Sequence, residues 1–398
     1  MIRVSPTVMA QDLMADLNIQ ACSLGTLTSF YYIGYTCMQI PVGLMLDRIG
    51  VRRPLTFACL LCLGGCMMFS MSSDIFIMSI GRFMMGVGSA FGFLSCVKTA
   101  SLWFHPTRLG VIIGLSMTIG TTGATFGYYP LASLVDQVTW RPSVMILASF
   151  GLILGLAAWL VIRDRYTNIY SSNAGEDHET FPILKSIWVI LKNPYTYVFG
   201  LYGSLMYVPL SGFADLWGST YLMNSYGLSR TEASGLVSTI YIGVAIGAPL
   251  SALLSDIYLS HKKVLLIGAL GSLLCFSTII YAPIPQAYTY PLYIIGGIFS
   301  GSQFLAFASV VNYNLPQISG AASGIHNMMC MMSGIIFQPF IGYLLDLCWD
   351  GSMHNGVSVF AQNDFLYALS VIPIGLVLSA LACLFMKETY LPDQPKGH

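Results

Sequence analysis

Charged side chains are scarce in this sequence. They make up 9% of the residues, whereas hydrophobic residues make up 56% and the mean hydropathy is +0.72. A soluble domain of 398 residues needs a charged surface, so this composition excludes one. Basic and acidic residues both number 17, and with no basic surface or tail we expect no nucleic-acid partner. The remaining class is an all-α protein that crosses a lipid bilayer many times.

A cleavable leader and a recognisable metal or catalytic set are also missing. The opening MIRVSPTVMAQDL has no basic segment followed by a long apolar run. Most of the ten cysteines lie in apolar spans, where a thiol packs as a small hydrophobe. Cys59, Cys62 and Cys66 share one helical face, but no histidine or carboxylate lies near them to complete a metal shell. We therefore expect no cofactor, no metal and no enzymatic activity.

The two halves of the chain repeat one another. The matched positions, 208 to 210 apart, are Pro41 with Pro249, Asp47 with Asp256, Arg52-Arg53 with Lys262-Lys263, and Asp136 with Asp346. Such spacing predicts two bundles of six helices (6+6) related by a pseudo-twofold axis along the membrane normal. The predicted division is an N-terminal bundle over 1–162, a linker with an amphipathic helix (Phe181–Leu191) over 163–193, and a C-terminal bundle over 194–398.

Apolar runs of about 20 residues, long enough to cross the hydrocarbon core, follow one another in both halves. The predicted spans are Leu27–Leu46, Leu55–Met71, Ile75–Leu102, Gly110–Val135, Ser143–Ile162, Tyr195–Leu222, Ser234–Leu254, Val264–Tyr281, Tyr290–Leu315, Ala321–Leu345 and Phe365–Met386. The repeat predicts a truncated first helix, Ile2–Met9, followed by a polar connector, Ala10–Gly25; a re-started chain with eleven helices is the alternative. Arginine and lysine gather in alternate connectors, which predicts that this side is cytoplasmic.

One loop between two spans carries a specific motif, GLMLDRIGVRRPL. Its anchor positions are Gly43, Asp47, Arg48, Gly50, Arg52 and Arg53, and Asp256 marks the degraded second copy. The loop resembles the signature between the second and third helices of the major facilitator superfamily, and the run from Arg82 to Ala90 resembles the helix-four pattern of that family. The resemblance implies the major facilitator fold and transport by alternating access, with the motif residues at the gate.

Two further runs resemble one branch of that family. They are Phe30-Tyr31-Tyr32 with Gln39-Ile40-Pro41, and Asp215-Leu216-Trp217-Gly218. They are similar to anion:cation symporters, phagosomal nutrient transporters and lysosomal dipeptide carriers. We expect a monomer in the inner membrane of a bacterium, and the cationic connectors predict that both termini and the central loop are in the cytoplasm.

Two arginines at membrane depth are candidate substrate ligands, because a buried charge is costly unless it faces a cavity or partner. Arg3 stands where the resembled branch has an arginine that contacts a substrate carboxylate, and a guanidinium fork suits a carboxylate. A terminal charge near the interface is the alternative for Arg3. Arg82 lies one heptad before Ser89, at which relatives often have a titrating glutamate. Proton coupling through this helix is therefore in doubt.

Asp215 is the only carboxylate well inside a span of the second half. Tyr207, Ser211, Asp215 and Ser219 recur every four residues and form a polar stripe that lipid would not tolerate. Desolvation favours the neutral form of a carboxyl group, so Asp215 is the leading proton-coupling candidate. A pair with a cation of the other half is the alternative.

Other polar and aromatic residues complete the predicted cavity. The remaining substrate-binding candidates are Tyr31, Tyr35, Gln39, Trp217, Gln303, Asn327 and Gln338, and His326 is the second proton-coupling candidate. His326 also opens the run HNMMCMM, whose soft ligands suit Cu(I), so copper transport is a minor alternative.

These features together predict a proton-coupled symporter that takes up a small organic solute bearing a carboxylate, such as an amino acid or short peptide. Transport of a carboxylate siderophore, a nucleoside or a sugar acid, and an efflux or facilitative carrier, are the alternatives.

Overall fold

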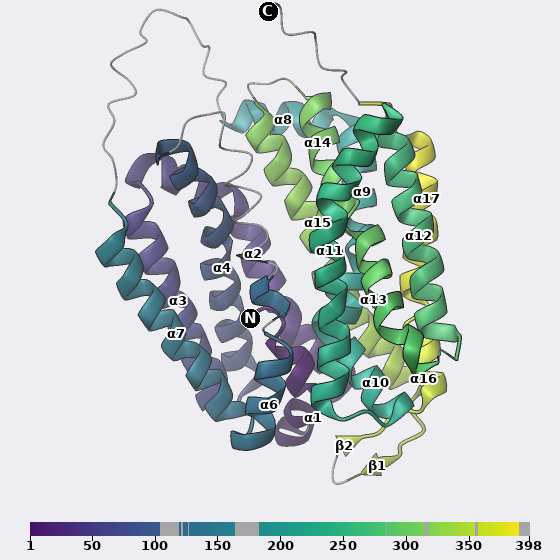
Figure 1. The fold of residues 1–398 in the computed structure, drawn as a ribbon. Helices are drawn as coiled ribbons and strands as arrows, with labels where there is room; N and C mark the ends of the chain where they lie inside the picture. Colours follow the sequence, from purple (N-terminus) through teal and green to yellow (C-terminus); the bar gives the residue numbers. More distant parts are fainter. Residues whose placement is uncertain are drawn as a thin grey trace, which may run out of the picture.

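Helices that run between two ends of the molecule make up most of the structure (Figure 1). It is a computed structural model and describes residues 1–103, 119–120, 122–125, 127–163, 183–283, 285–314, 318–354 and 357–389. We call the end with helix α8 the cationic end, since the loop with Arg48, Arg52 and Arg53 lies there. The opposite end, with Asp12, Asp16 and Asp136, is the acidic end.

The first half contains α1 (Ser5–Leu17), α2 (Ala21–Ile49), α3 (Arg52–Met71), α4 (Ile75–Trp103), α6 (Tyr129–Val138) and α7 (Trp140–Val161). The spans predicted from Leu27, Leu55, Ile75 and Ser143 are confirmed as α2, α3, α4 and α7. The first part of the span predicted over Gly110–Val135, residues 110–118, lies outside the described residues, and α6 covers its end. α1 begins about halfway between the two ends and runs to the acidic end (Figure 1).

The predicted polar connector Ala10–Gly25 is wrong. Only three residues, Asn18 to Gln20, separate α1 from α2, and Asn18 adopts the left-handed conformation that ends α1. One face of α1, with Ala10, Leu13 and Met14, is buried. The other face carries Asp12 and Asp16, and these acidic residues led to the prediction of a polar connector.

The second half contains α9 (Pro194–Met206), η1 (Pro209–Trp217), α10 (Gly218–Tyr226), α11 (Arg230–Tyr258), α12 (His261–Tyr281), α13 (Gln286–Ser300), α14 (Gln303–Tyr313), α15 (Ser319–Cys348), α16 (Gln362–Ala368) and α17 (Val371–Phe385). A hairpin of β1 (Met353–His354) and β2 (Val357–Ser358) lies at the acidic end. Three predicted spans are each made of consecutive pieces, and the piece η1 is a π-helix. The predicted amphipathic helix is α8 (Ile183–Lys192), which lies across the cationic end.

Eight helices among the described residues are long and apolar enough to cross a membrane. Large apolar side chains such as Leu160, Leu274 and Phe385 are more than two-thirds exposed on them, as lipid-facing positions require. The 6+6 helix count stays a prediction, because 104–118 lies outside the described residues.

The two halves meet most closely where α2 packs on α15. A Cβ atom added at Gly25 would lie 2.4 Å from the Gln338 carbonyl oxygen, and one at Gly342 would lie 2.4 Å from the Ala21 carbonyl oxygen. The two backbones therefore touch, and only glycine permits this approach. The described part of the chain is closed along this seam toward the acidic end.

Candidate functional site

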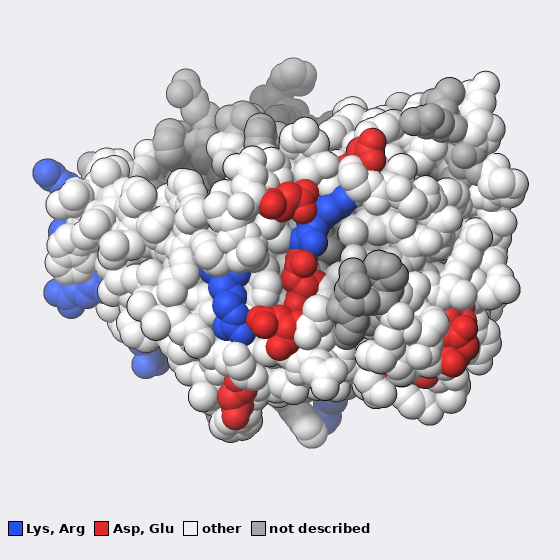
Figure 2. All heavy atoms as spheres, turned by 90° about the horizontal axis from the view of Figure 1, so that it is seen from below, with Lys and Arg blue, Asp and Glu red and all other residues white. Residues whose placement is uncertain are grey.

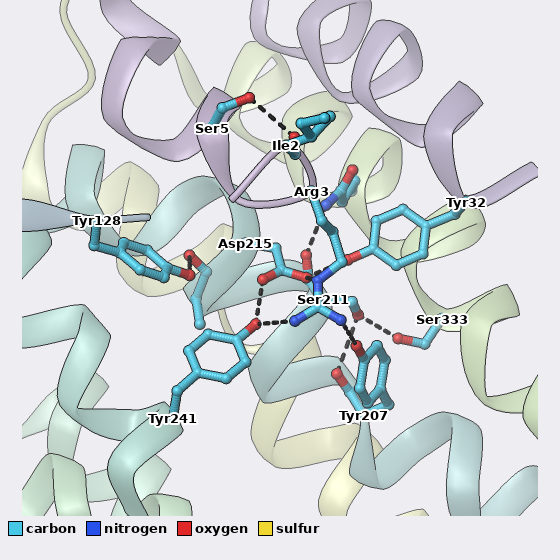
Figure 3. Close-up of polar contacts among 12 residues, drawn as sticks. Ile2, Arg3, Ser5, Tyr32, Tyr128, Tyr207, Ser211, Asp215, Tyr241 and Ser333 are labelled. Carbon is cyan, nitrogen blue, oxygen red and sulfur yellow. Dashed lines mark hydrogen bonds and ion pairs between the residues drawn. The ribbon is translucent and has the colours of Figure 1, made fainter. Parts of the chain in front are cut away.

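An ion pair joins the two halves (Figure 3) close to the start of the chain, which lies near the middle of the molecule (Figure 1). Arg3, just before α1, places its Nε atom 3.3 Å from Oδ2 of Asp215 on η1. Its two terminal nitrogens donate hydrogen bonds to the Tyr207 hydroxyl at 2.8 Å and the Tyr241 hydroxyl at 3.0 Å. The guanidinium therefore has partners from η1, α11 and the end of α9. These contacts bring together three residues that the sequence predicted, Arg3, Tyr207 and Asp215.

Asp215 is completely enclosed by this cluster. Its side chain has no exposed surface, and the hydroxyls of Tyr32 and Tyr241 donate to its two oxygens. Tyr32 comes from α2 in the first half and Tyr241 from α11 in the second. A buried carboxylate costs several kcal/mol unless it is paired and hydrogen-bonded, and Asp215 meets both conditions. The predicted alternative, a pair with a cation of the other half, is the arrangement found.

The π-helix η1 is held in place by α15. The Gln338 side chain donates from Nε2 to the Ser211 carbonyl at 2.8 Å, and the Ser211 and Ser333 hydroxyls bond to each other. The Trp217 indole donates to the Gln338 carbonyl at 3.1 Å. Trp217 is fully buried, so in this structure it packs between helices. Two predicted ligands, Trp217 and Gln338, thus support the segment that carries Asp215.

Arg82 is a buried cation without an anion among the described residues. It is 1% exposed, and its Nη1 donates to the Ile2 carbonyl at 3.0 Å. Its guanidinium lies 5.1 Å from the ring centre of Tyr31 and 5.9 Å from that of Phe69, and its Nε atom has no acceptor. Ser89 is half-buried further along α4. Because Ile2 immediately precedes Arg3, this hydrogen bond places Arg82 of α4 next to the segment that carries Arg3.

The remaining candidates on α2 are Tyr31, Tyr35 and Gln39, of which Gln39 contacts the second half. The Tyr31 and Tyr35 rings stack with centroids 6.3 Å apart. The side-chain oxygen of Gln39 accepts a hydrogen bond from the Asn327 amide of α15 at 2.9 Å. Gln39 and Asn327, both predicted ligands, therefore meet across the halves.

Gln303 and His326 lie apart from the ion pair. The Gln303 amide is buried, and neither its nitrogen nor its oxygen has a partner. His326 packs edge-on against Phe307 at 4.5 Å, its Nε2 lies 3.6 Å from the Cys330 sulfur, and its Nδ1 has no partner. The described residues contain no group of three or more His, Cys, Asp or Glu that could hold a metal, including around His326.

The loop motif ties helices of the first half together. Gly50 ends α2 with a φ of 86°, a conformation that favours glycine. Arg52 donates to the Trp159 carbonyl at 2.7 Å and lies over the Trp159 ring at 4.2 Å, which joins α3 to α7. Of the other motif residues, Gly43 lies near Leu94. The side chains of Arg48, Arg53 and Asp256 are exposed, and that of Asp47 is outside the described part of the structure.

Sequence reasoning missed a charge cluster at the acidic end, where red and blue side chains alternate over the junction of the halves (Figure 2). Arg230, the first residue of α11, pairs with Asp12 of α1 through two nitrogens and with Asp136 of α6 at 3.1 Å. Arg141 pairs with Asp16 at 2.8 Å, within the first half. Basic residues are rare in the connectors of the acidic end, so the presence of Arg230 and Arg141 there was the sequence signal that could have indicated these ion pairs.

A second contact across the acidic end was also missed. The carboxylate of Asp346 on α15 accepts the backbone N–H groups of Ala21 and Cys22 at 2.9 and 2.7 Å. Asp346 therefore caps the N-terminus of α2, where a negative charge is favourable. The sequence repeat singled out Asp346 but assigned it no role.

Comparisons with known proteins agree with this architecture. The chain is 22% identical to the hexuronate transporter of Bacillus subtilis over 90% of this chain and 89% of that protein. It is 23% identical to the lysosomal dipeptide transporter MFSD1 of Danio rerio over 63% of this chain and 57% of that protein. A crystal structure of a bacterial homolog to the human lysosomal transporter Spinster superposes with a TM-score of 0.76 at 14% identity, covering 96% of this chain and 91% of that one.

The sequence model described as Major Facilitator Superfamily matches residues 1–339, which is most of the chain. The match includes the loop motif and the run from Arg82 on which the resemblance was based. A transporter of this family is not an enzyme, and the helices described here form its fold. The chain therefore belongs to the Major Facilitator Superfamily of multi-pass membrane transporters.

Proposed function

We propose that this transporter is a proton-coupled symporter that takes up a small organic solute bearing a carboxylate, such as an amino acid or short peptide. The observation that carries the proposal is the Arg3–Asp215 pair, which joins the two halves and leaves a second guanidinium, Arg82, with no anion paired to it in the described part of the chain. Both cations are at a depth where an uncompensated charge costs several kcal/mol. A negatively charged solute supplies what the site lacks.

Charge balance in this cluster links the proton to the solute. With Asp215 ionised, Arg3, Arg82 and Asp215 sum to one positive charge. When Asp215 takes up a proton, Arg3 loses its counter-ion, and its fork becomes available to a carboxylate in the same geometry. Proton and anion therefore bind together more favourably than either alone, which is the condition for symport.

The contacts between the two halves indicate how the transporter would change between a state open at the acidic end and one open at the cationic end. The ion pairs of Arg230 and the α2–α15 seam hold the acidic end closed. Opening that end requires these contacts to break and others to form at the cationic end, with the Arg3–Asp215 cluster near the pivot. We place the acidic end outside the cell and the cationic end, with helix α8, in the cytoplasm of a bacterium.

The substrate class is proposed from the arginines and supported by the names of relatives. A hexuronate and a dipeptide both present a carboxylate, and the relatives named for them match this chain. The Gln39–Asn327 pair and the unbonded Gln303 amide offer neutral hydrogen bonds for the rest of such a molecule. These amides could bind either a peptide or a sugar acid and do not discriminate between them, so a sugar acid stays the second candidate substrate.

Uptake into proteoliposomes tests the proposal. With an inward pH gradient, the wild type should accumulate amino acids, dipeptides or hexuronates from a radiolabelled panel. Asp215→Asn should abolish accumulation but retain counterflow, because the neutral amide mimics the protonated carboxyl. Asp350→Asn, at an exposed acid on the loop after α15, is the matched control and should transport normally. Accumulation by Asp215→Asn at the wild-type rate would refute the coupling role.

A further inference from the structure

The outward face of α8 has the composition of a surface that meets lipid headgroups. Lys185, Trp188, Val189 and Lys192 recur at helical spacing and are all exposed, whereas Ile190 on the opposite face is fully buried against the bundle. Trp188 is 61% exposed. α8 lies across the cationic end rather than along the bundle (Figure 1), so this face is presented at the level of one leaflet.

Two lysines from distant parts of the chain lie over aromatic rings of one short segment. The Lys192 ammonium lies 5.0 Å from the centre of the Trp188 ring. The Lys387 ammonium, just beyond the last helix α17, lies 4.9 Å from the centre of the Tyr195 ring. Tyr195 follows Lys192 by three residues, so the segment 188–195 gathers both cations. Each ring orients an ammonium group while leaving its hydrogen-bond donors available.

The nearest acid in sequence is already engaged elsewhere. Glu388 follows Lys387, but its two oxygens accept hydrogen bonds from the Ser260 hydroxyl and the His261 backbone N–H. These contacts anchor the segment after α17 to the start of α12. They fix the backbone next to Lys387 and occupy both oxygens of the carboxylate.

We propose that Lys192 and Lys387, with Trp188 and Tyr195, form a binding site for the headgroup phosphate of an anionic phospholipid in the leaflet at the cationic end. The two ammonium groups neutralise the phosphate, and the rings lie at the depth of the headgroup layer, where Trp and Tyr are favoured. A soluble anion would leave the exposed Trp188 and Leu191 side chains in water, whereas a lipid covers them with its chains. The bound lipid joins the linker helix to the end of the last helix.

Native mass spectrometry of the full chain in neutral detergent, titrated with phosphatidylglycerol or phosphatidylcholine, tests this site. We expect one phosphatidylglycerol to bind more tightly than phosphatidylcholine. Lys192→Gln with Lys387→Gln should weaken that binding about 25-fold, because each lysine near an anionic surface contributes about fivefold. Lys263→Gln, which removes an exposed lysine at the same end, is the matched control and should change binding less than twofold.

Three results would overturn the proposal. They are an equal loss in the double variant and the control, no preference for phosphatidylglycerol, or complete displacement of the lipid by an equal concentration of inorganic phosphate. Trp188→Ala separates folding from binding, since it keeps both charges; it should lower lipid affinity without lowering the melting temperature. Because the measurement involves no transport, its outcome is independent of the proposed symport.

Discussion

Replacement of Arg230 should open the acidic end of the transporter. Arg230 belongs to the second half, and its partners Asp12 and Asp136 belong to the first, so their ion pairs exist only while the halves are together. The pair with Asp12 is bidentate and partly buried, and we assign it about 1.5 kcal/mol. The more exposed pair with Asp136 adds about 0.5 kcal/mol. Arg230→Gln should therefore shift the closed-to-open equilibrium by about 2 kcal/mol, or roughly 30-fold.

The distance between spin labels at Met71 and Tyr226 measures this shift in nanodiscs. Both positions are exposed at the acidic end, one in each half. Arg141→Gln is the matched control, because it breaks an ion pair at the same end but within the first half. It should leave the distance distribution unchanged. The reasoning fails if Arg230→Gln leaves the long-distance population as in the wild type, or if Arg141→Gln increases it equally.

Three further substitutions test other parts of the structure. Arg82→Met should raise the unfolding free energy in detergent by about 1 to 3 kcal/mol, because it removes a buried cation that has no ion pair among the residues described. It should also abolish uptake of anionic solutes, and a lowered melting temperature would contradict this. Gly342→Val places side-chain atoms against the Ala21 carbonyl and should destabilise the closed seam by about 2 kcal/mol, seen as a longer Met71–Tyr226 distance, whereas Gly320→Val, with open space, should not. Tyr241→Phe removes the hydroxyl that donates to Asp215 and accepts from Arg3, and should slow uptake of anionic solutes; uptake at the wild-type rate would show that this hydroxyl does not support the ion pair.

The sequence predicted the positions of those helices whose surface is mostly apolar and exposed to lipid. The spans of α3 and α7 are continuous apolar runs, so composition alone located them. The segment of α1 failed because its acids are paired with Arg230 and Arg141 across the tertiary structure, and polarity then indicates a contact rather than a loop. The local sequence pattern cannot tell an acidic residue in a tertiary ion pair from one in an exposed loop.

The candidate site was predictable in its charged members and in Tyr207, but not in Tyr32 and Tyr241. Arg3 and Asp215 stood out because charges are rare at membrane depth, and the structure brings them together. Tyr32 and Tyr241 complete the cluster, yet a chain with 23 tyrosines gives no reason to choose these two. Their role depends on how α2 and α11 pack, which spacing along one helix does not determine.

The π-helix η1 has a consequence for how a proton could start the cycle. At its end the Gly218 N–H bonds to the Phe213 carbonyl, five residues back, where an α-helix would bond four back. Rewinding one such turn to α would rotate Asp215 relative to α10 by about one residue, roughly 100°. Neutralising the carboxyl group removes its tie to Arg3, so a change of backbone register within a single turn could exchange its neighbours before either bundle begins to tilt.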